Sequence, residues 1–201
     1  MKNSIYIFIL ISVIACKSND KKEPADTPLE TTVEETRATV MEPAANQLVP
    51  DEEDGGEMLL GKIDRAGLQL EQFNAWYVEN DSLHQVDTTL ISGLKLNLKP
   101  LTIKVFMGSW CEDSQKLVPS LFKVLDAAEF DYSNIEMIAV DHDKKTPNGL
   151  EMDYNIEYVP TLIFSENGEE LNRIVEYEIE TLEKDMFKIV NKQPYKNVYA
   201  E

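Results

Sequence analysis

The chain has 201 residues and a formal net charge of −18, from 19 basic and 37 acidic side chains. This length suits one domain of ordinary size and is too short for two comfortable ones. The negative charge would repel nucleic acids and anionic lipid surfaces, so it argues against functions that depend on phosphate contacts.

The N-terminus predicts export. Residues 5–15 are an unbroken run of apolar and small residues between Lys2 and Cys16. A membrane-spanning helix needs about 20 such residues, so this shorter run is typical of a secretory signal peptide. The sequence Val-Ile-Ala-Cys that ends at Cys16 resembles the lipobox of bacterial lipoproteins. The resemblance implies that residues 1–15 are removed and that Cys16 is lipidated; the alternative is a signal cut elsewhere.

A lipid anchor predicts a place in the bacterial cell envelope, facing the periplasm or the cell surface. Several acyl chains bind essentially permanently, since each buried methylene contributes about 0.8 kcal/mol. Lys17 is not the aspartate that retains lipoproteins at the inner membrane of some bacteria, which favours the outer membrane. Cysteines in such an oxidising compartment are normally paired. With Cys16 lipidated, Cys111 has no partner in its own chain and is either inert or a working thiol.

Residues 17–56 are rich in Glu, Asp, Thr, Pro and Ala and contain no Trp, Tyr or Phe. Such a segment cannot bury enough apolar surface to fold, so we predict an acidic disordered tether over residues 16–56. Its acidic run at residues 51–54 lacks the alternating ligand spacing of a calcium loop and is interpreted as solvated charge. The folded domain is then predicted to span residues 57–201.

The first part of this domain shows apolar residues at regular spacing. Residues 68–77 suit one face of a short helix, residues 83–86 a short edge strand, and residues 90–96 a second short helix or turn. Residues 101–107 are apolar and β-branched enough to be a buried strand.

The rest of the chain predicts the order of the core. A helix over residues 113–128 and a buried strand over residues 135–140 complete a βαβ unit, which implies parallel pairing with a right-handed crossover. A weak helix follows at residues 150–154. A strand at residues 161–164, an Asn-Gly turn, a return strand and a helix at residues 181–191 form a ββα unit. The predicted fold is therefore α/β, with a central mixed sheet flanked by helices.

A cysteine lies where the first core strand meets its helix, in the sequence Ser-Trp-Cys-Glu-Asp-Ser that ends at Ser114. Unpaired N–H groups and the dipole at a helix N-terminus favour the thiolate of Cys111, which is the species that attacks a disulfide. Glu112 and Asp113 place carboxylates beside the sulfur and oppose this effect. The alternative is a buried structural thiol.

Three separated features of residues 101–192 resemble the thioredoxin superfamily. Trp110 and Cys111 lie at the strand-to-helix junction. Pro119 lies where the family has the proline that kinks its active-site helix, and the segment from Val159 through Pro160 to the next residue is similar to the family's cis-proline loop. The resemblance implies a thioredoxin-like fold, a catalytic Cys111 shielded on one side by Trp110, and a cis peptide bond at Val159-Pro160 whose exposed backbone pairs with an extended substrate.

Two departures from the family alter the predicted chemistry. Ser114 occupies the position of the second cysteine, so the motif is C-x-x-S, and a hydroxyl cannot resolve a mixed disulfide. Val105 stands where thioredoxin has a buried acid that serves the same step. The sequence therefore predicts a monothiol protein that forms mixed disulfides with extracytoplasmic proteins or small thiols, in an isomerase-like or deglutathionylating role. The alternative is a peptide-binding module in which Cys111 does not turn over.

Other candidate sites are weak. His84 is alone in a polar stretch, and the loop at residues 141–143, Asp-His-Asp, lacks a convincing fourth metal ligand. We expect no metal, no cofactor and no nucleic-acid partner.

Overall fold

The computed structural model describes residues 45–200. The predicted signal peptide at residues 1–15, Cys16 and the tether up to residue 44 lie outside the described residues. Between residues 45 and 200, no helix combines the length and the apolar character that a membrane span requires.

Six strands form one sheet in the order β1-β2-β4-β3-β5-β6. The pairing of β3 with β4 is parallel and every other pairing is antiparallel. The strands are β1 (Gln47–Pro50), β2 (Glu57–Ile63), β3 (Leu101–Met107), β4 (Ile135–Ala139), β5 (Thr161–Glu166) and β6 (Glu169–Val175). The sheet is therefore mixed, as the sequence predicts.

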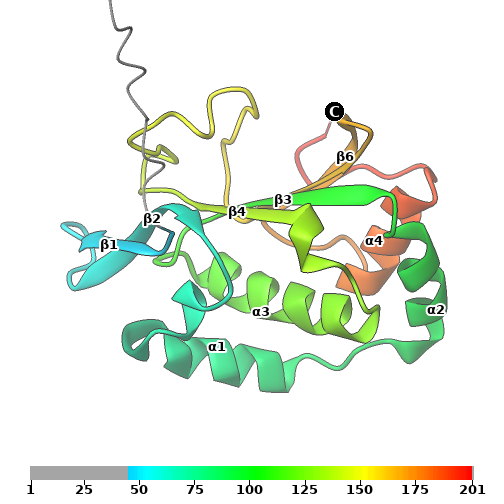
Figure 1. Cartoon of the computed structure of the whole chain (residues 1–201), viewed down its shortest axis with the longest axis horizontal. Coiled ribbons are helices and arrows are strands. Elements are labelled where there is room, and N and C mark those ends of the chain that lie inside the picture. The colour runs from blue at the N-terminus through cyan, green and yellow to red at the C-terminus, as the bar shows by residue number, and fades with distance from the viewer. Residues whose placement is uncertain (1–44, 201) are drawn as a thin grey trace, which may run out of the picture. The chain divides into compact units, whose positions relative to one another are not determined.

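Four α-helices lie on one side of this sheet (Figure 1). They are α1 (Glu71–Leu83), α2 (Thr88–Asn97), α3 (Glu112–Ala127) and α4 (Leu182–Val190), with short 3-10 helices η1 (Gly67–Gln69) and η2 (Tyr132–Asn134). The parallel β3-α3-β4 unit and the β5-β6-α4 unit confirm the predicted order of the core.

The strands of the sheet centre bury side chains on both faces. Along β3, Ile103, Val105 and Met107 contribute to the core beneath the helices, whereas Phe106 belongs to a second cluster on the opposite face. This alternation follows from the two-residue period of a strand. The irregular segment at residues 141–160, drawn in yellow in Figure 1, covers the second face. Helices therefore cover one face of the sheet only.

Two predicted elements are wrong. Residues 83–86 are not a strand, because Leu83 ends α1 with 68% of its surface exposed and has no strand to pair with. Residues 150–154 form turns and not a helix. There the buried Glu151 carboxylate accepts hydrogen bonds from the backbone N–H and the hydroxyl of Thr146, which closes a tight loop in place of a helical turn.

The prediction of a disordered tether as far as residue 56 is wrong at its C-terminal end, because residues 47–50 form β1 and pair with β2. Leu48 packs against the main core, which gives this polar segment the apolar contact that its composition seemed to exclude. Asp51 accepts hydrogen bonds from the backbone of Glu53 and Asp54 and so orders the turn. The glycines at 55 and 56 complete the turn with positive φ angles of 82° and 80°, which glycine adopts without strain. The folded domain therefore includes this hairpin.

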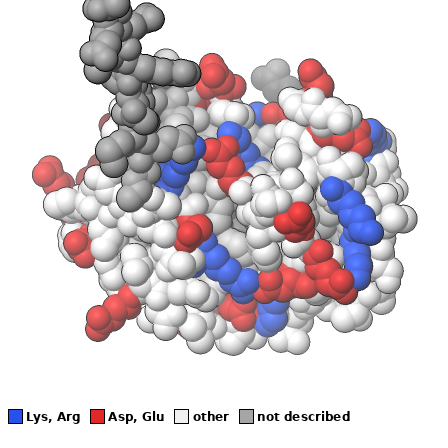
Figure 2. All heavy atoms as spheres, viewed as in Figure 1, with Lys and Arg blue, Asp and Glu red and all other residues white. Residues whose placement is uncertain are grey.

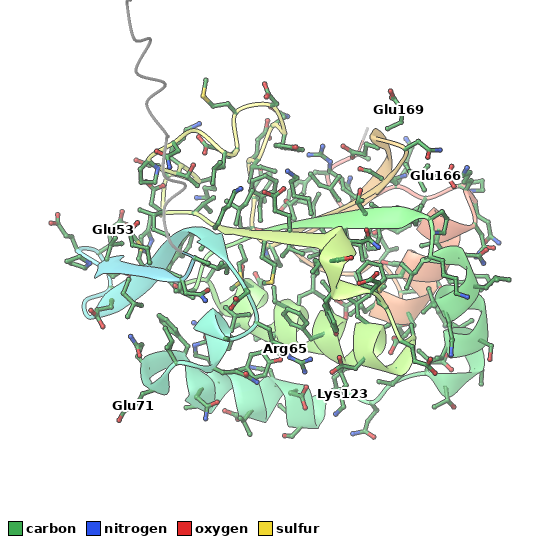
Figure 3. All side chains as sticks on the ribbon, viewed as in Figure 1. Glu53, Arg65, Glu71, Lys123, Glu166 and Glu169 are labelled. Carbon is green, nitrogen blue, oxygen red and sulfur yellow. The ribbon has the colours of Figure 1, made fainter. Side chains whose placement is uncertain are left out.

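Arg65 joins the hairpin side of the domain to the helices (Figure 3). Its Nε donates to the hydroxyl of Tyr77 in α1 at 2.7 Å, and its Nη1 donates to both carboxylate oxygens of Asp126 in α3 at 3.0 and 2.8 Å. The segment after β2 is thus fastened to α3, the helix that begins beside the predicted active-site cysteine.

Candidate functional site

Cys111 lies between the end of β3 and the first residue of α3. Its backbone N–H donates to the Gly108 carbonyl at 3.1 Å, and its own carbonyl accepts the N–H of Gln115 at 2.9 Å. Cys111 is therefore the N-cap residue of a 16-residue helix. The side chain is half-buried, and the helix dipole at this end favours negative charge.

The thiol of Cys111 touches the predicted cis-proline loop. Its Sγ donates to the Val159 carbonyl oxygen at 3.2 Å across a sequence separation of 48 residues. The Val159-Pro160 peptide bond is cis, as expected from the sequence, and the side chain of Val159 is buried in the second core cluster. The structure thus brings together the two separated motifs on which the predicted site depends.

Trp110 is held in place from three sides. Its Nε1 donates to the Val140 carbonyl at 3.0 Å. Its ring stacks on the His142 ring with centroids 4.1 Å apart and an interplanar angle of 20°. It also lies so close to Gly108 that a Cβ there would come within 2.5 Å of the indole. The backbone before the cysteine therefore needs glycine, a requirement that the sequence alone did not reveal.

His142 is in turn fixed by the β1-β2 hairpin. Its Nε2 lies 3.1 Å from Asp51 Oδ1, and its Nδ1 lies 3.6 Å from a carboxylate oxygen of Glu53. Burial raises the pKa of Asp51, but the backbone N–H groups of Asp54 and Glu53, together with the His142 ring, outweigh it and hold this pKa below its ordinary value. Asp51 therefore remains a carboxylate at neutral pH and can anchor the ring that supports Trp110.

The same contacts bring together the acidic run at residues 51–54 and the loop at residues 141–143, each of which is a weak metal site by its sequence alone. Asp51, Asp54 and His142 offer ligand atoms that all lie within 4.8 Å of one another. Asp51 already accepts two backbone N–H groups and contacts the imidazole. These hydrogen bonds account for the cluster as a structural link between the hairpin and the loop after β4.

Ser114, which occupies the position of the family's second cysteine, has no exposed surface. Its hydroxyl accepts the N–H of Gly108 at 3.2 Å. The neighbouring Ser109 hydroxyl accepts the N–H of Leu59 in β2 at 2.9 Å, and the Ser109 carbonyl accepts the side-chain amide of Gln115 at 2.8 Å. Both hydroxyls therefore stabilise the strand-to-helix junction. Ser109 also attaches the junction to the hairpin, a role that its place in the motif did not indicate.

The sequence suggests that His84 is isolated, but the structure gives it a partner. Its Nε2 lies 2.9 Å from the carboxylate of Glu183 in α4, which is buried and also accepts the N–H of Asp87. The contact is consistent with a structural role, because it gives a buried charge two partners.

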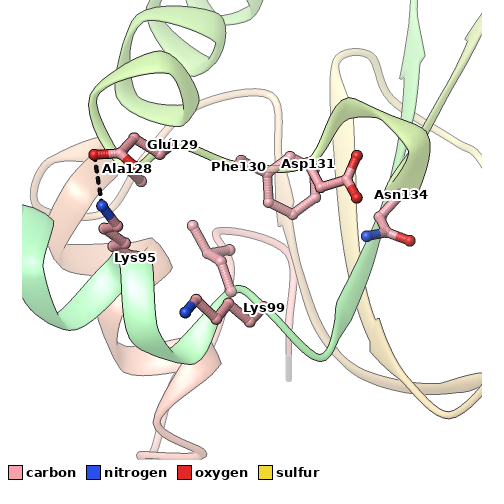
Figure 4. A pocket seen from close by; sticks show the side chains of 8 residues that line it. Lys95, Lys99, Ala128, Glu129, Phe130, Asp131 and Asn134 are labelled. Carbon is pink, nitrogen blue, oxygen red and sulfur yellow. Dashed lines mark ion pairs between the residues drawn. The ribbon is translucent and has the colours of Figure 1, made fainter.

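A separate hollow of about 240 Å³ lies at the other end of α3 (Figure 4). An ion pair between Lys95 and Glu129 joins its two sides at 2.5 Å. Sixteen residues of helix are about 24 Å long, so this hollow is far from Cys111. Its lining contains neither cysteine nor histidine.

Acidic and basic side chains are interspersed over the face that Figure 2 shows, which therefore lacks the continuous basic surface that nucleic acids require.

Comparison with known proteins finds similarity to one family model and to solved structures. Residues 93–189 match the Thioredoxin family model. No curated protein matches the chain. Among solved structures, a protein of unknown function from Pseudomonas aeruginosa is similar at 15% identity, over 65% of this chain and 88% of that one, with a TM-score of 0.47. Oxidized mitochondrial thioredoxin 3 from Saccharomyces cerevisiae is similar at 19% identity, over 50% of this chain and 86% of that one, with a TM-score of 0.29. The family match includes β3 to β6 and α3 but not the β1-β2 hairpin.

Removing the His142 ring is expected to change the environment of Trp110. In a Trp76→Phe background, which leaves Trp110 as the sole tryptophan, His142→Ala should shift the fluorescence emission to longer wavelength by several nanometres, because one face of the indole becomes exposed to water. His84→Ala is the matched control, since its ring contacts Glu183 and should leave the emission unchanged. An unshifted spectrum for His142→Ala would contradict the supporting role of the stack.

Proposed function

The chain carries a domain of the thioredoxin-like superfamily, and on this premise we propose that it forms mixed disulfides through Cys111 as a monothiol protein. The contact of the Cys111 sulfur with the Val159 carbonyl, at the N-terminus of α3, is the observation that carries the proposal. It combines a helix end that favours the thiolate with a loop whose backbone lies beside the sulfur.

The proposed reaction is one thiol-disulfide exchange. The Cys111 thiolate attacks one sulfur of a partner disulfide, the old S–S bond breaks, and the second sulfur leaves as a thiolate that takes a proton from water. The mixed disulfide is then released by a thiolate from outside the chain. Ser114 has no sulfur and is buried, and Cys111 is the sole cysteine of the described residues. An isomerase-like or deglutathionylating role fits this dependence on a second thiol.

A peptide-binding module is the second candidate, and the same contact favours it in one respect. The Cys111 thiol donates a hydrogen bond to the Val159 carbonyl, and a thiolate has no hydrogen to donate in this contact. Glu112 and Asp113 add carboxylates in the first turn of α3, which oppose the thiolate. In this alternative the groove beside Pro160 holds an extended peptide without turnover.

We further propose that lipidated Cys16 anchors the protein in the bacterial cell envelope, with the outer membrane favoured. The basis is the lipobox-like sequence that ends at Cys16. In detergent phase separation of membranes from expressing bacteria, the wild type and Cys111→Ser should enter the detergent phase. Cys16→Ala should remain aqueous or unprocessed, and a mature Cys16→Ala protein in the detergent phase would exclude the anchor.

The exchange reaction is tested with a small neutral disulfide. In the full chain carrying Cys16→Ala, which leaves one thiol, incubation with bis(2-hydroxyethyl) disulfide should add one mercaptoethanol group at Cys111, detected by intact-mass spectrometry. Added thiol should remove it, because the chain has no resolving cysteine. The further variant Cys111→Ser should gain no adduct. If the folded protein stays unmodified while the denatured protein reacts, the exchange proposal fails and the binding module is the better account.

A further inference from the structure

A groove borders the proposed active site between α3 and the segment that follows β6. Its lining includes Asp113 and Lys116 from the start of α3 and Glu176, Tyr177 and Glu178 from that segment. Its volume of about 240 Å³ is below the roughly 300–1,000 Å³ of small-molecule sites. The groove therefore suits one side chain of a polypeptide better than a separate small ligand.

Backbone contacts connect this groove to the reactive sulfur. The N–H of Glu176 donates to the carbonyl of Pro160 at 2.8 Å, directly after the residue whose carbonyl accepts the Cys111 thiol. On the other wall, Asp113 follows Cys111 by two residues in the first turn of α3. A partner joined to Cys111 by a disulfide would therefore place its neighbouring side chains beside the groove.

The groove and its rim are predominantly acidic. Three carboxylates, from Asp113, Glu176 and Glu178, line the groove together with the ammonium group of Lys116. Lys116 lies 3.9 Å from Asp113 and 3.8 Å from a fourth carboxylate, that of neighbouring Glu112. The imidazole of His84, which also lines the groove, is engaged with buried Glu183. A single lysine does not neutralise four carboxylates, so the surface beside the sulfur attracts positive charge.

Aromatic rings add a second feature suited to cations. Tyr177 lines the groove with 51% of its surface exposed. Tyr158, which precedes Val159, stacks on Tyr199 with ring centroids 3.9 Å apart, and the Tyr199 hydroxyl bonds to the Glu176 carboxylate. That carboxylate raises the pKa of Tyr199 to about 12, so the ring stays neutral. Lysine and arginine side chains bind favourably over neutral aromatic faces.

We propose that this groove makes Cys111 selective for partners that carry lysine or arginine next to their reactive cysteine. The inference rests on the proposed exchange reaction and names its substrate class. Complementary charge raises association rates about 10- to 1,000-fold. Salt weakens this charge attraction, because the Debye length falls from about 10 Å at 0.1 M to about 3 Å at 1 M.

The test compares peptides that differ only in charge. Peptides of equal length, each with one cysteine as a mixed disulfide with mercaptoethanol and flanked by either Lys or Glu, are reacted with the full chain carrying Cys16→Ala. Each rate of mixed-disulfide formation is divided by the rate with bis(2-hydroxyethyl) disulfide, which cancels changes in the reactivity of the thiol itself. The cationic peptide should react about tenfold faster than the anionic one at low salt, and the ratio should approach one at 1 M salt.

Matched variants separate the groove from net charge. Glu176→Gln with Glu178→Gln should lower the ratio of cationic to anionic rates several-fold. Glu71→Gln with Glu169→Gln removes the same charge from sites outside the groove, labelled in Figure 3, and should preserve the ratio. Equal rates for the two peptides, or an equal loss of the rate ratio in both double variants, would overturn the proposed selectivity of the groove. Either result would leave the exchange reaction in place. Failure of the neutral disulfide to react would overturn the exchange reaction itself.

Discussion

The packing of α3 against β3 determines where the chemistry of this protein lies. Because β3 and β4 are parallel, the chain must leave the sheet at the end of β3, and α3 provides the crossover. Buried apolar side chains along α3 hold it against the sheet, and each contributes about 1.5–3 kcal/mol. The turn between the two elements is therefore fixed, and the single thiol of the domain stands at the N-terminus of the helix. The same edge of the sheet receives the Val159-Pro160 loop, whose carbonyl meets the sulfur.

The N-terminal hairpin is part of this arrangement although it lies outside the family match. Ser109 bonds to β2, and Asp51 holds the His142 ring against Trp110. These contacts link the hairpin to Ser109 and Trp110, the two residues before the cysteine. The site therefore depends on three parts of the chain: the hairpin, the strand-to-helix junction and the cis-proline loop. The hydroxyl of Ser114, in place of a second sulfur, serves the junction and not the reaction.

The core was predictable from sequence because its elements carry strong periodic signals. Residues 101–107 and the helix that follows bury apolar side chains at the spacing of a strand and a helix, and both appear as expected. The hairpin was not predictable, because β1 has four residues in a polar segment and is stabilised by a partner strand and by Leu48. The prediction of a strand at residues 83–86 is wrong, because so short an apolar pattern does not distinguish the end of a helix from a strand. Contacts such as Asp51 with His142 join residues 91 positions apart, and no local pattern reveals them.

The proposed exchange reaction requires that Cys111 is a reachable thiol at a helix N-terminus. The most direct measurement is the rate at which iodoacetamide, a neutral reagent, alkylates Cys111 at neutral pH in the folded chain and in denaturant, quantified by peptide mapping. The helix end favours the thiolate, which is the reacting species, and the side chain is half-exposed. We therefore expect faster alkylation in the folded chain, despite the carboxylates of Glu112 and Asp113. Slower alkylation in the folded chain than in denaturant would contradict the account and identify Cys111 as an inert thiol.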